Sequence, residues 1–153
     1  MKKNLFLVCL FMFGTLASCQ CSSKKSADNA VVNTTETPVP LGDPFILLHD
    51  GVYYAYGTHS NKGIEFYTSD DLLTWKYGGL ALNKEDSWAD RWFWAPEIYF
   101  VNGKFYMYYS ADEHICVAVA DSPTGPFVQD KKEPMIADEK CIDNSLFIDD
   151  NGT

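Results

Sequence analysis

Apolar and polar positions alternate along the chain from Pro44 onward, in short runs rich in aromatic and β-branched residues. Turn pairs such as Asp50-Gly51 and Asn102-Gly103 separate these runs. This part of the chain shows no convincing helical period. Alternation with a period of two, interrupted by turn residues, is typical of β-strands. The pattern therefore predicts an all-β fold.

Three similar segments recur along this part of the chain. They read DPFILLHDGVYYAYGTHS, APEIYFVNGKFYMYYSAD and DNSLFIDDNGT, the last as the start of a copy. An Asp-Gly or Asn-Gly pair between apolar strands is a strong hairpin signal. The turn glycines Gly51, Gly103 and Gly152 recur about every fifty residues, a period typical of four-stranded propeller blades. Unrelated hairpins of a β-sandwich are the alternative, but the matching tyrosine-rich second strands favour blades.

The first two segments continue into further strands. GIEFYTSDDLLTWKYGG supplies the third and fourth strands of the first blade, and HICVAVADSPTGPFVQD supplies those of the second. The sequence thus predicts two blades and the start of a third. Because a propeller closes its ring to protect its edge strands, we expect this chain to be the N-terminal part of a longer protein.

The first residues resemble a bacterial export signal. Two lysines precede an apolar run, 5–13, that is too short to span a bilayer. The run leads to Leu16-Ala17-Ser18-Cys19, which resembles the lipobox of bacterial lipoproteins. An ordinary signal peptide is the alternative. We expect 1–18 to be a lipoprotein signal peptide, Cys19 to carry lipid, and the protein to be exported and anchored to the cell envelope.

Composition separates a tether from a folded part. Residues 19–40 are rich in Ser, Thr, Asn and Lys and lack an apolar period, which predicts a flexible tether. The folded part, an incomplete propeller domain, is then 41–153. The chain has a net charge of −9, and both lysine clusters precede the folded part. This acidity argues against nucleic acid and anionic lipid as partners, so we expect membrane contact only through the lipid anchor.

The folded part contains two cysteines, Cys116 and Cys141. A disulfide between them and two buried free thiols are both compatible with the sequence. No Cys-x-x-Cys or His-Cys spacing typical of a zinc site is present. We therefore predict no metal ligands in this stretch and no cofactor.

Two aspartates occupy matching places in the repeat. Alignment by the turns, allowing the third turn one extra residue, makes Asp43-Pro44, Ala95-Pro96 and Asp143-Asn144 equivalent. These are the starts of the innermost strands, which line the axis of a propeller, so Asp43 and Asp143 should share one pocket. Paired carboxylates suit glycoside hydrolysis, where one activates water and another tunes or donates a proton. The alternative is that each aspartate only starts a turn or caps a strand.

The same segments resemble a known enzyme family. GDPFILLHDGVYYAYGT, FWAPEIYFVNGKFYMYYS and CIDNSLFIDDNG look like the first three blades of glycoside hydrolase family 43, five-bladed propeller enzymes that act on arabinan, xylan and related plant polysaccharides. The resemblance implies an inverting glycosidase with a carbohydrate substrate. Asp43 would be the general base. Asp143 would orient the general acid and modulate its pKa.

The resemblance places the general acid, a glutamate, in a later blade that this chain does not include. Relatives can hold a cation on the axis, but no ligand for one can be named here. Asn144 departs from the common pattern, because many relatives have proline at this place. Strand alternation is expected to turn Glu97 away from the axis, which favours a structural role over that of the acid. Trp94 is expected at the pocket rim, where its indole could stack on a sugar ring.

Other propeller functions remain as alternatives. A glycan-binding lipoprotein without hydrolytic activity would keep the pocket and lack the acid. Protein-interaction propellers do not require aspartates at two inner strand starts. Fructan-hydrolysing propellers typically show Asn-Asp-Pro-Asn-Gly and Arg-Asp-Pro, whereas this chain has Gly42-Asp43-Pro44-Phe45 and Ile142-Asp143-Asn144.

Overall fold

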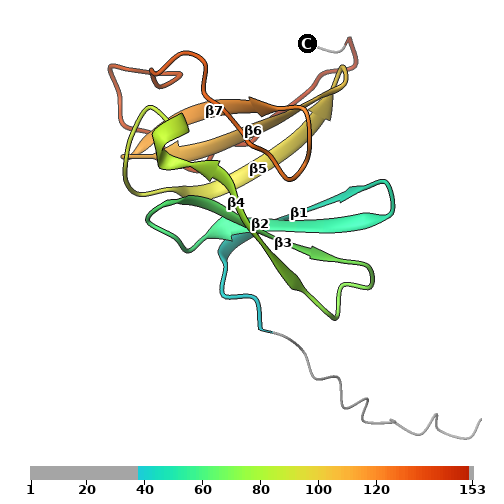
Figure 1. The fold of residues 1–153 in the computed structure, drawn as a ribbon. Helices are drawn as coiled ribbons and strands as arrows, with labels where there is room; N and C mark the ends of the chain where they lie inside the picture. The colour runs from blue at the N-terminus through green and yellow to red at the C-terminus, as the bar shows by residue number, and fades with distance from the viewer. Residues whose placement is uncertain (1–37, 152–153) are drawn as a thin grey trace, which may run out of the picture. The chain divides into compact units, whose positions relative to one another are not determined.

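The structure is a computed structural model that describes residues 38–151. This part consists of β-strands, one short 3-10 helix (η1, Lys84–Asp86) and loops (Figure 1). The predicted signal peptide, Cys19 and most of the predicted tether lie outside the described residues. Within 38–151 there is no helix of the length and apolarity needed to cross a membrane.

The first sheet is antiparallel, with the strand order β1-β2-β3-β4 (Figure 1). Its strands are β1 (Gly42–His49), β2 (Val52–Thr58), β3 (Gly63–Ser69) and β4 (Lys76–Asn83). Asp50 and Gly51 connect β1 to β2 with φ angles of 48° and 80°. Positive φ at both turn residues is the geometry that an Asp-Gly pair favours in a two-residue hairpin. This sheet is the predicted four-stranded blade.

The second sheet contains β5 (Trp94–Val101), β6 (Lys104–Ala111) and β7 (His114–Ala120). Asn102 and Gly103 repeat the positive φ angles of the first hairpin turn, at 50° and 78°. The predicted fourth strand is reduced to two isolated bridges, one between Val119 and Val128 and one between Phe127 and Leu82 of β4. Pro126 lacks the backbone N–H that a regular ladder needs, which accounts for the loss of strand structure here.

The segment that follows β7 covers the edge of this strand without forming a regular strand itself. Val128 N donates to Val119 O at 3.0 Å, and Met135 N donates to Ile115 O at 2.8 Å. Cys141 N donates to Glu113 O at 3.0 Å. These bonds satisfy backbone groups that an open edge would leave unpaired.

The predicted first strand of the third blade, 142–149, has no strand structure among the described residues. A strand requires a hydrogen-bonded neighbour, and this segment has none within 38–151. Two side chains of the second sheet hold it instead. Asp143 N donates to Ser110 Oγ at 3.2 Å, and Leu146 N donates to the Tyr99 hydroxyl at 3.4 Å. Gly152, the predicted turn glycine of this segment, lies outside the described residues.

One buried cluster joins the two sheets. Its residues are Tyr56, Ile64, Phe66, Ala81, Leu82, Phe93, Ile98, Phe105, Met107, Tyr109, Ala111, Cys116, Ala118, Ala120 and Phe127. Phe127 follows β7 in sequence, yet its N–H donates to Ala81 O of β4 at 2.8 Å. The segment after the second sheet therefore closes onto the first sheet, and burial of these apolar side chains stabilises the arrangement.

Gln129 is a buried polar junction between the two sheets. Its N–H donates to Asp86 O at 2.9 Å. Its side-chain oxygen accepts from Trp88 N at 2.7 Å and from the Tyr109 hydroxyl at 3.1 Å, and its Nε2 donates to Glu133 O at 2.6 Å. Because every polar atom of the amide has a partner, its burial carries little cost in free energy.

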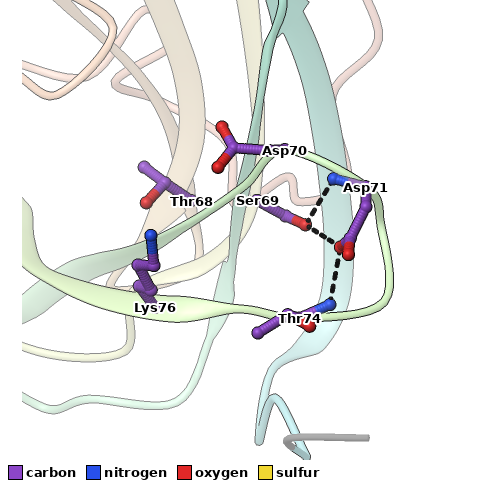
Figure 2. A pocket seen from close by; sticks show the side chains of 6 residues that line it. All are labelled: Thr68, Ser69, Asp70, Asp71, Thr74 and Lys76. Atoms are coloured by element: carbon purple, nitrogen blue, oxygen red, sulfur yellow. Dashed lines mark hydrogen bonds between the residues drawn. The ribbon is translucent and has the colours of Figure 1, made fainter. Parts of the chain in front are cut away.

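The β3–β4 turn is closed by a carboxylate. Ser69 Oγ donates to Asp71 Oδ1, which also accepts from Thr74 N at 2.8 Å (Figure 2). Leu73 N donates to the same oxygen at 2.8 Å. The backbone N–H groups of Thr74 and then Leu73 lower the pKa of Asp71. A small depression of about 120 Å³ lies beside the turn, lined by Thr68, Ser69, Asp70, Asp71, Thr74 and Lys76. Since Asp71 is engaged by the turn itself, its role here is structural.

Both cysteines of the described chain are free thiols. Cys116 is fully buried, and burial raises the pKa of its thiol to about 11. We predict that a maleimide reagent at neutral pH leaves Cys116 unmodified in the folded protein and modifies it after unfolding, because the thiolate is the reactive form. Peptide mass spectrometry measures the modification. Labelling of Cys116 in the folded state, or a Cys116–Cys141 disulfide, would contradict this arrangement.

Candidate active site

The strand β1 begins with a β-bulge. Gly42 pairs with Thr58 and Phe45 pairs with Tyr56, so Asp43 and Pro44 lie opposite the single residue Gly57. A Cβ at Gly57 would lie 2.6 Å from Gly42 O, so the bulge requires glycine at this place. Proline is tolerated in a strand at bulges, where its missing N–H breaks no ladder bond.

The strand β5 begins with the same bulge. Trp94 pairs with Ser110 and Glu97 pairs with Tyr108, so two residues again lie opposite one. The first bulge residues, Asp43 and Ala95, have φ angles of 45° and 41°, and Asp143 has 58°. Residues other than glycine rarely adopt positive φ. The backbone therefore confirms that these three positions are equivalent.

One cavity of about 390 Å³ is formed by these three positions and their neighbours. Its lining residues are Asp43, Pro44, Phe45, Ala95, Pro96, Glu97, Asp143, Asn144 and Ser145. Each of the three segments thus contributes the same three consecutive places. Asp43 and Asp143, which are far apart in sequence, line this cavity together as the repeat predicts.

The hydroxyl of Thr58 connects the first sheet to the second at this cavity. It donates to Asp43 Oδ2 at 3.0 Å and accepts from Ala95 N at 3.0 Å. Ser110 occupies the corresponding place in β6, and its hydroxyl accepts from Asp143 N at 3.2 Å. In both sheets, a hydroxyl at the end of the second strand therefore binds the backbone N–H of the equivalent residue at the start of the next segment, Ala95 or Asp143. The sequence analysis missed this role. Its signal in the sequence is a hydroxyl residue at the same place in both copies, Thr58 in the first and Ser110 in the second.

Glu97 lies in the cavity wall, so the expectation that alternation turns it away is wrong. The extra residue of the bulge shifts the alternation of the strand that follows it. The Tyr99 hydroxyl donates to Glu97 Oε2 at 2.5 Å. Burial raises the pKa of Tyr99 and the bond to Glu97 raises it further, so the hydroxyl stays a donor. Glu97 is therefore a hydrogen-bonded partner within the sheet, as the sequence also suggested.

Asn144 stands where the first two segments have proline. Its side-chain amide atoms are inaccessible to solvent and form no hydrogen bond with the described residues. An unpaired buried amide costs free energy. Asn144 thus places an amide without a partner among the described residues where the first two segments have proline.

Trp94 lies beside the cavity and does not line it. It lines a neighbouring depression of about 140 Å³ together with Thr58, His59, Ser60, Asn61, Trp92 and Phe93. The rings of Trp92 and Trp94 are stacked, with centroids 5.8 Å apart. Within 38–151, no group of three or more His, Cys, Asp or Glu residues is arranged to hold a metal ion.

The family model described as glycosyl hydrolases family 43 matches residues 35–153. Among similar proteins is a xylosidase/arabinosidase 43A from Humicola insolens, 40% identical over 76% of this chain and 42% of that protein. The chain thus spans less than half the length of this relative.

Solved structures show the same fold. The chain is similar to an endo-1,4-beta-xylanase from Bacteroides thetaiotaomicron, with 49% identity and a TM-score of 0.69 over 74% of this chain and 40% of that one. It is also similar to an endo-arabinase from the same organism, with 35% identity and a TM-score of 0.63 over 73% and 42% of the two chains.

We predict that Thr58→Val lowers the free energy of unfolding of the full-length gene product by about 1–2 kcal/mol, because Ala95 N loses its acceptor and Asp43 loses a donor. Thr58→Ser keeps the hydroxyl and is the matched control, with a loss of less than about 0.5 kcal/mol. Urea unfolding measures both changes. Equal stability of the valine variant and the wild type would show that the hydroxyl does not hold the two sheets together.

Proposed function

The chain belongs to the glycosyl hydrolases of family 43, and from this membership we propose that the full-length protein is a glycosidase acting on arabinan, xylan or arabinoxylan. The observation that carries the proposal is that Asp43 and Asp143, at equivalent positions with positive φ angles, line one cavity. The substrate class is supported by the names of the similar proteins, which include a xylosidase/arabinosidase, a xylanase and an arabinase.

Asp43 is proposed as the general base. Its carboxylate removes a proton from a water molecule while the water oxygen forms a bond to the anomeric carbon of the sugar. The glycosidic bond breaks, and its oxygen leaves with a proton from a general acid. Because water attacks the face opposite the leaving group, the configuration inverts. The bond from Thr58 engages one oxygen of Asp43, which orients the carboxylate and leaves the other oxygen for water.

Asp143 is proposed to orient the general acid and to modulate its pKa. The acid is proposed to be a glutamate of a later blade of the full-length protein. Glu97 is a poor candidate for this role, because its carboxylate already accepts a hydrogen bond from Tyr99.

The protein is also proposed to be exported and attached to the cell envelope through lipid on Cys19. Support comes from the two lysines, the short apolar run and the Leu16-Ala17-Ser18-Cys19 sequence. An enzyme in this place would meet polysaccharide fragments outside the cytoplasm, which suits the proposed substrates.

We predict that Asp43→Asn in the full-length gene product lowers kcat by about 10²–10⁴-fold, because the amide cannot accept the proton from water. Release of the aryl group from aryl arabinofuranosides and aryl xylosides measures turnover. Asp143→Asn should also lower kcat, through the general acid. Asp70→Asn is the matched control, since Asp70 lies by the β3–β4 turn, outside the cavity.

Two outcomes would contradict this account. Unchanged turnover of a folded Asp43→Asn protein would remove Asp43 from the mechanism. No turnover by the wild type, with binding of xylan or arabinan oligosaccharides retained, would favour a glycan-binding propeller without hydrolytic activity.

A further inference from the structure

The strand β5 carries a polar pair beside the cavity, Glu97 and Tyr99. The two residues are two positions apart, so their side chains lie on the same face of the strand. Both are half-buried, and the Tyr99 hydroxyl donates to Glu97 Oε2 at 2.5 Å. Such a distance is typical of a hydroxyl that donates to an ionised carboxylate, and bonds of this kind are stronger than neutral ones. Glu97 therefore fixes the direction of the Tyr99 hydroxyl.

The same hydroxyl contacts the segment that carries Asp143. Leu146 N donates to the Tyr99 oxygen at 3.4 Å. A phenol has one proton to donate, so a proton committed to Glu97 leaves the oxygen lone pairs to accept from Leu146. Donation to a charged group also makes the oxygen a better acceptor, because linked hydrogen bonds polarise one another. A short chain of hydrogen bonds thus runs from Glu97 in the cavity wall through Tyr99 to Leu146.

The polar pair is a departure from the repeat. In the alignment by the turns, Glu97 and Tyr99 occupy the places of Phe45 and Leu47 in the first segment. A carboxylate and a phenol thus stand where the first copy has two apolar side chains, and burying such polar groups costs free energy unless they are hydrogen-bonded. The departure falls where the second sheet contacts the third segment, at the bond between Tyr99 and Leu146. This place indicates a role toward the third segment.

Aromatic neighbours hold the ring of Tyr99 in place. Phe45 of β1 lies 5.9 Å from it and Tyr108 of β6 lies 6.1 Å from it, measured between ring centroids. A ring packed by two others keeps one position, and so does its hydroxyl. Tyr99 does not itself line the cavity. Any effect of its hydroxyl on the cavity therefore passes through its hydrogen-bond partners, Glu97 and Leu146.

We propose that the Tyr99 hydroxyl, held by Glu97, positions the segment of Asp143 for the general-acid step, which makes Tyr99 a positioning residue for the hydrolysis. The proposal rests on the proposed function, in which Asp143 orients the general acid. Ser110 Oγ accepts from Asp143 N at 3.2 Å, and Tyr99 holds the same segment three residues further on. Loss of the second contact lets the backbone that carries Asp143 move about the first. A displacement of about 1 Å in an active site can lower turnover about 10²-fold.

The test compares two aryl glycosides, of xylose or arabinofuranose, as substrates of the full-length gene product. A phenyl leaving group needs a proton from the general acid, whereas a dinitrophenyl leaving group is a weak base and leaves without one. We expect Tyr99→Phe, which removes only the hydroxyl, to lower kcat about tenfold on the phenyl glycoside and less than about twofold on the dinitrophenyl glycoside. An unfolded fraction of the variant would lower both kcat values by the same factor. The ratio of the two losses therefore reports positioning and not stability.

Three further variants complete the test. Asp143→Asn is the reference, and its loss of kcat should also be larger on the phenyl glycoside. Glu97→Gln keeps an acceptor oxygen for Tyr99 and should lower kcat on the phenyl glycoside by only about two- to threefold. Tyr77→Phe is the matched control, because the Tyr77 hydroxyl donates to Glu65 at 3.1 Å in a tyrosine–glutamate pair of β4 and β3 that does not line the cavity. Its kcat values should equal those of the wild type.

The outcomes separate this proposal from the hydrolase proposal. Equal losses on the two glycosides for Tyr99→Phe, or no loss, would overturn the positioning role; where Asp143→Asn still distinguishes the two substrates, the hydrolase proposal stands. A leaving-group dependence for Tyr99→Phe without one for Asp143→Asn would also overturn it, because Tyr99 would then not act through Asp143. Absence of turnover by the wild type would contradict the hydrolase and, with it, this role of Tyr99.

Discussion

The Thr58 hydroxyl forms the contact on which the site depends. It binds the carboxylate of Asp43 in one sheet and the backbone of Ala95 in the next, so it fixes a reactive group and joins two blades at once. Ser110 repeats the backbone part of this contact toward Asp143. In each sheet a hydroxyl binds the start of the following segment. The repetition of this contact places Asp43 and Asp143 in the wall of one cavity.

The bulge explains why this contact is possible. Two residues opposite one bend the start of β1 and β5, and the first of them adopts positive φ. At the start of β5, the bulge turns the backbone N–H of Ala95 toward the Thr58 hydroxyl. In both strands, three consecutive residues at the bulge line the cavity. Strained backbone of this kind is retained where the surrounding structure over-determines it. The strain here coincides with the proposed catalytic residues.

Local signals in the sequence predicted the hairpins, because Asp-Gly and Asn-Gly pairs determine their own turn geometry. The repeat then predicted the shared cavity of Asp43 and Asp143. The direction of Glu97 could not be predicted, because an extra bulge residue reverses alternation without a local signal. The Thr58 contacts join residues 15 and 37 positions apart, so they could be found only in the folded arrangement.

The most direct test is a crystal structure of the full-length Asp43→Asn protein with a bound xylo- or arabino-trisaccharide. We expect a sugar ring in the cavity lined by Asp43 and Asp143, with a water molecule between its anomeric carbon and the side chain at position 43. A trisaccharide bound elsewhere, with the cavity empty of sugar, would contradict it.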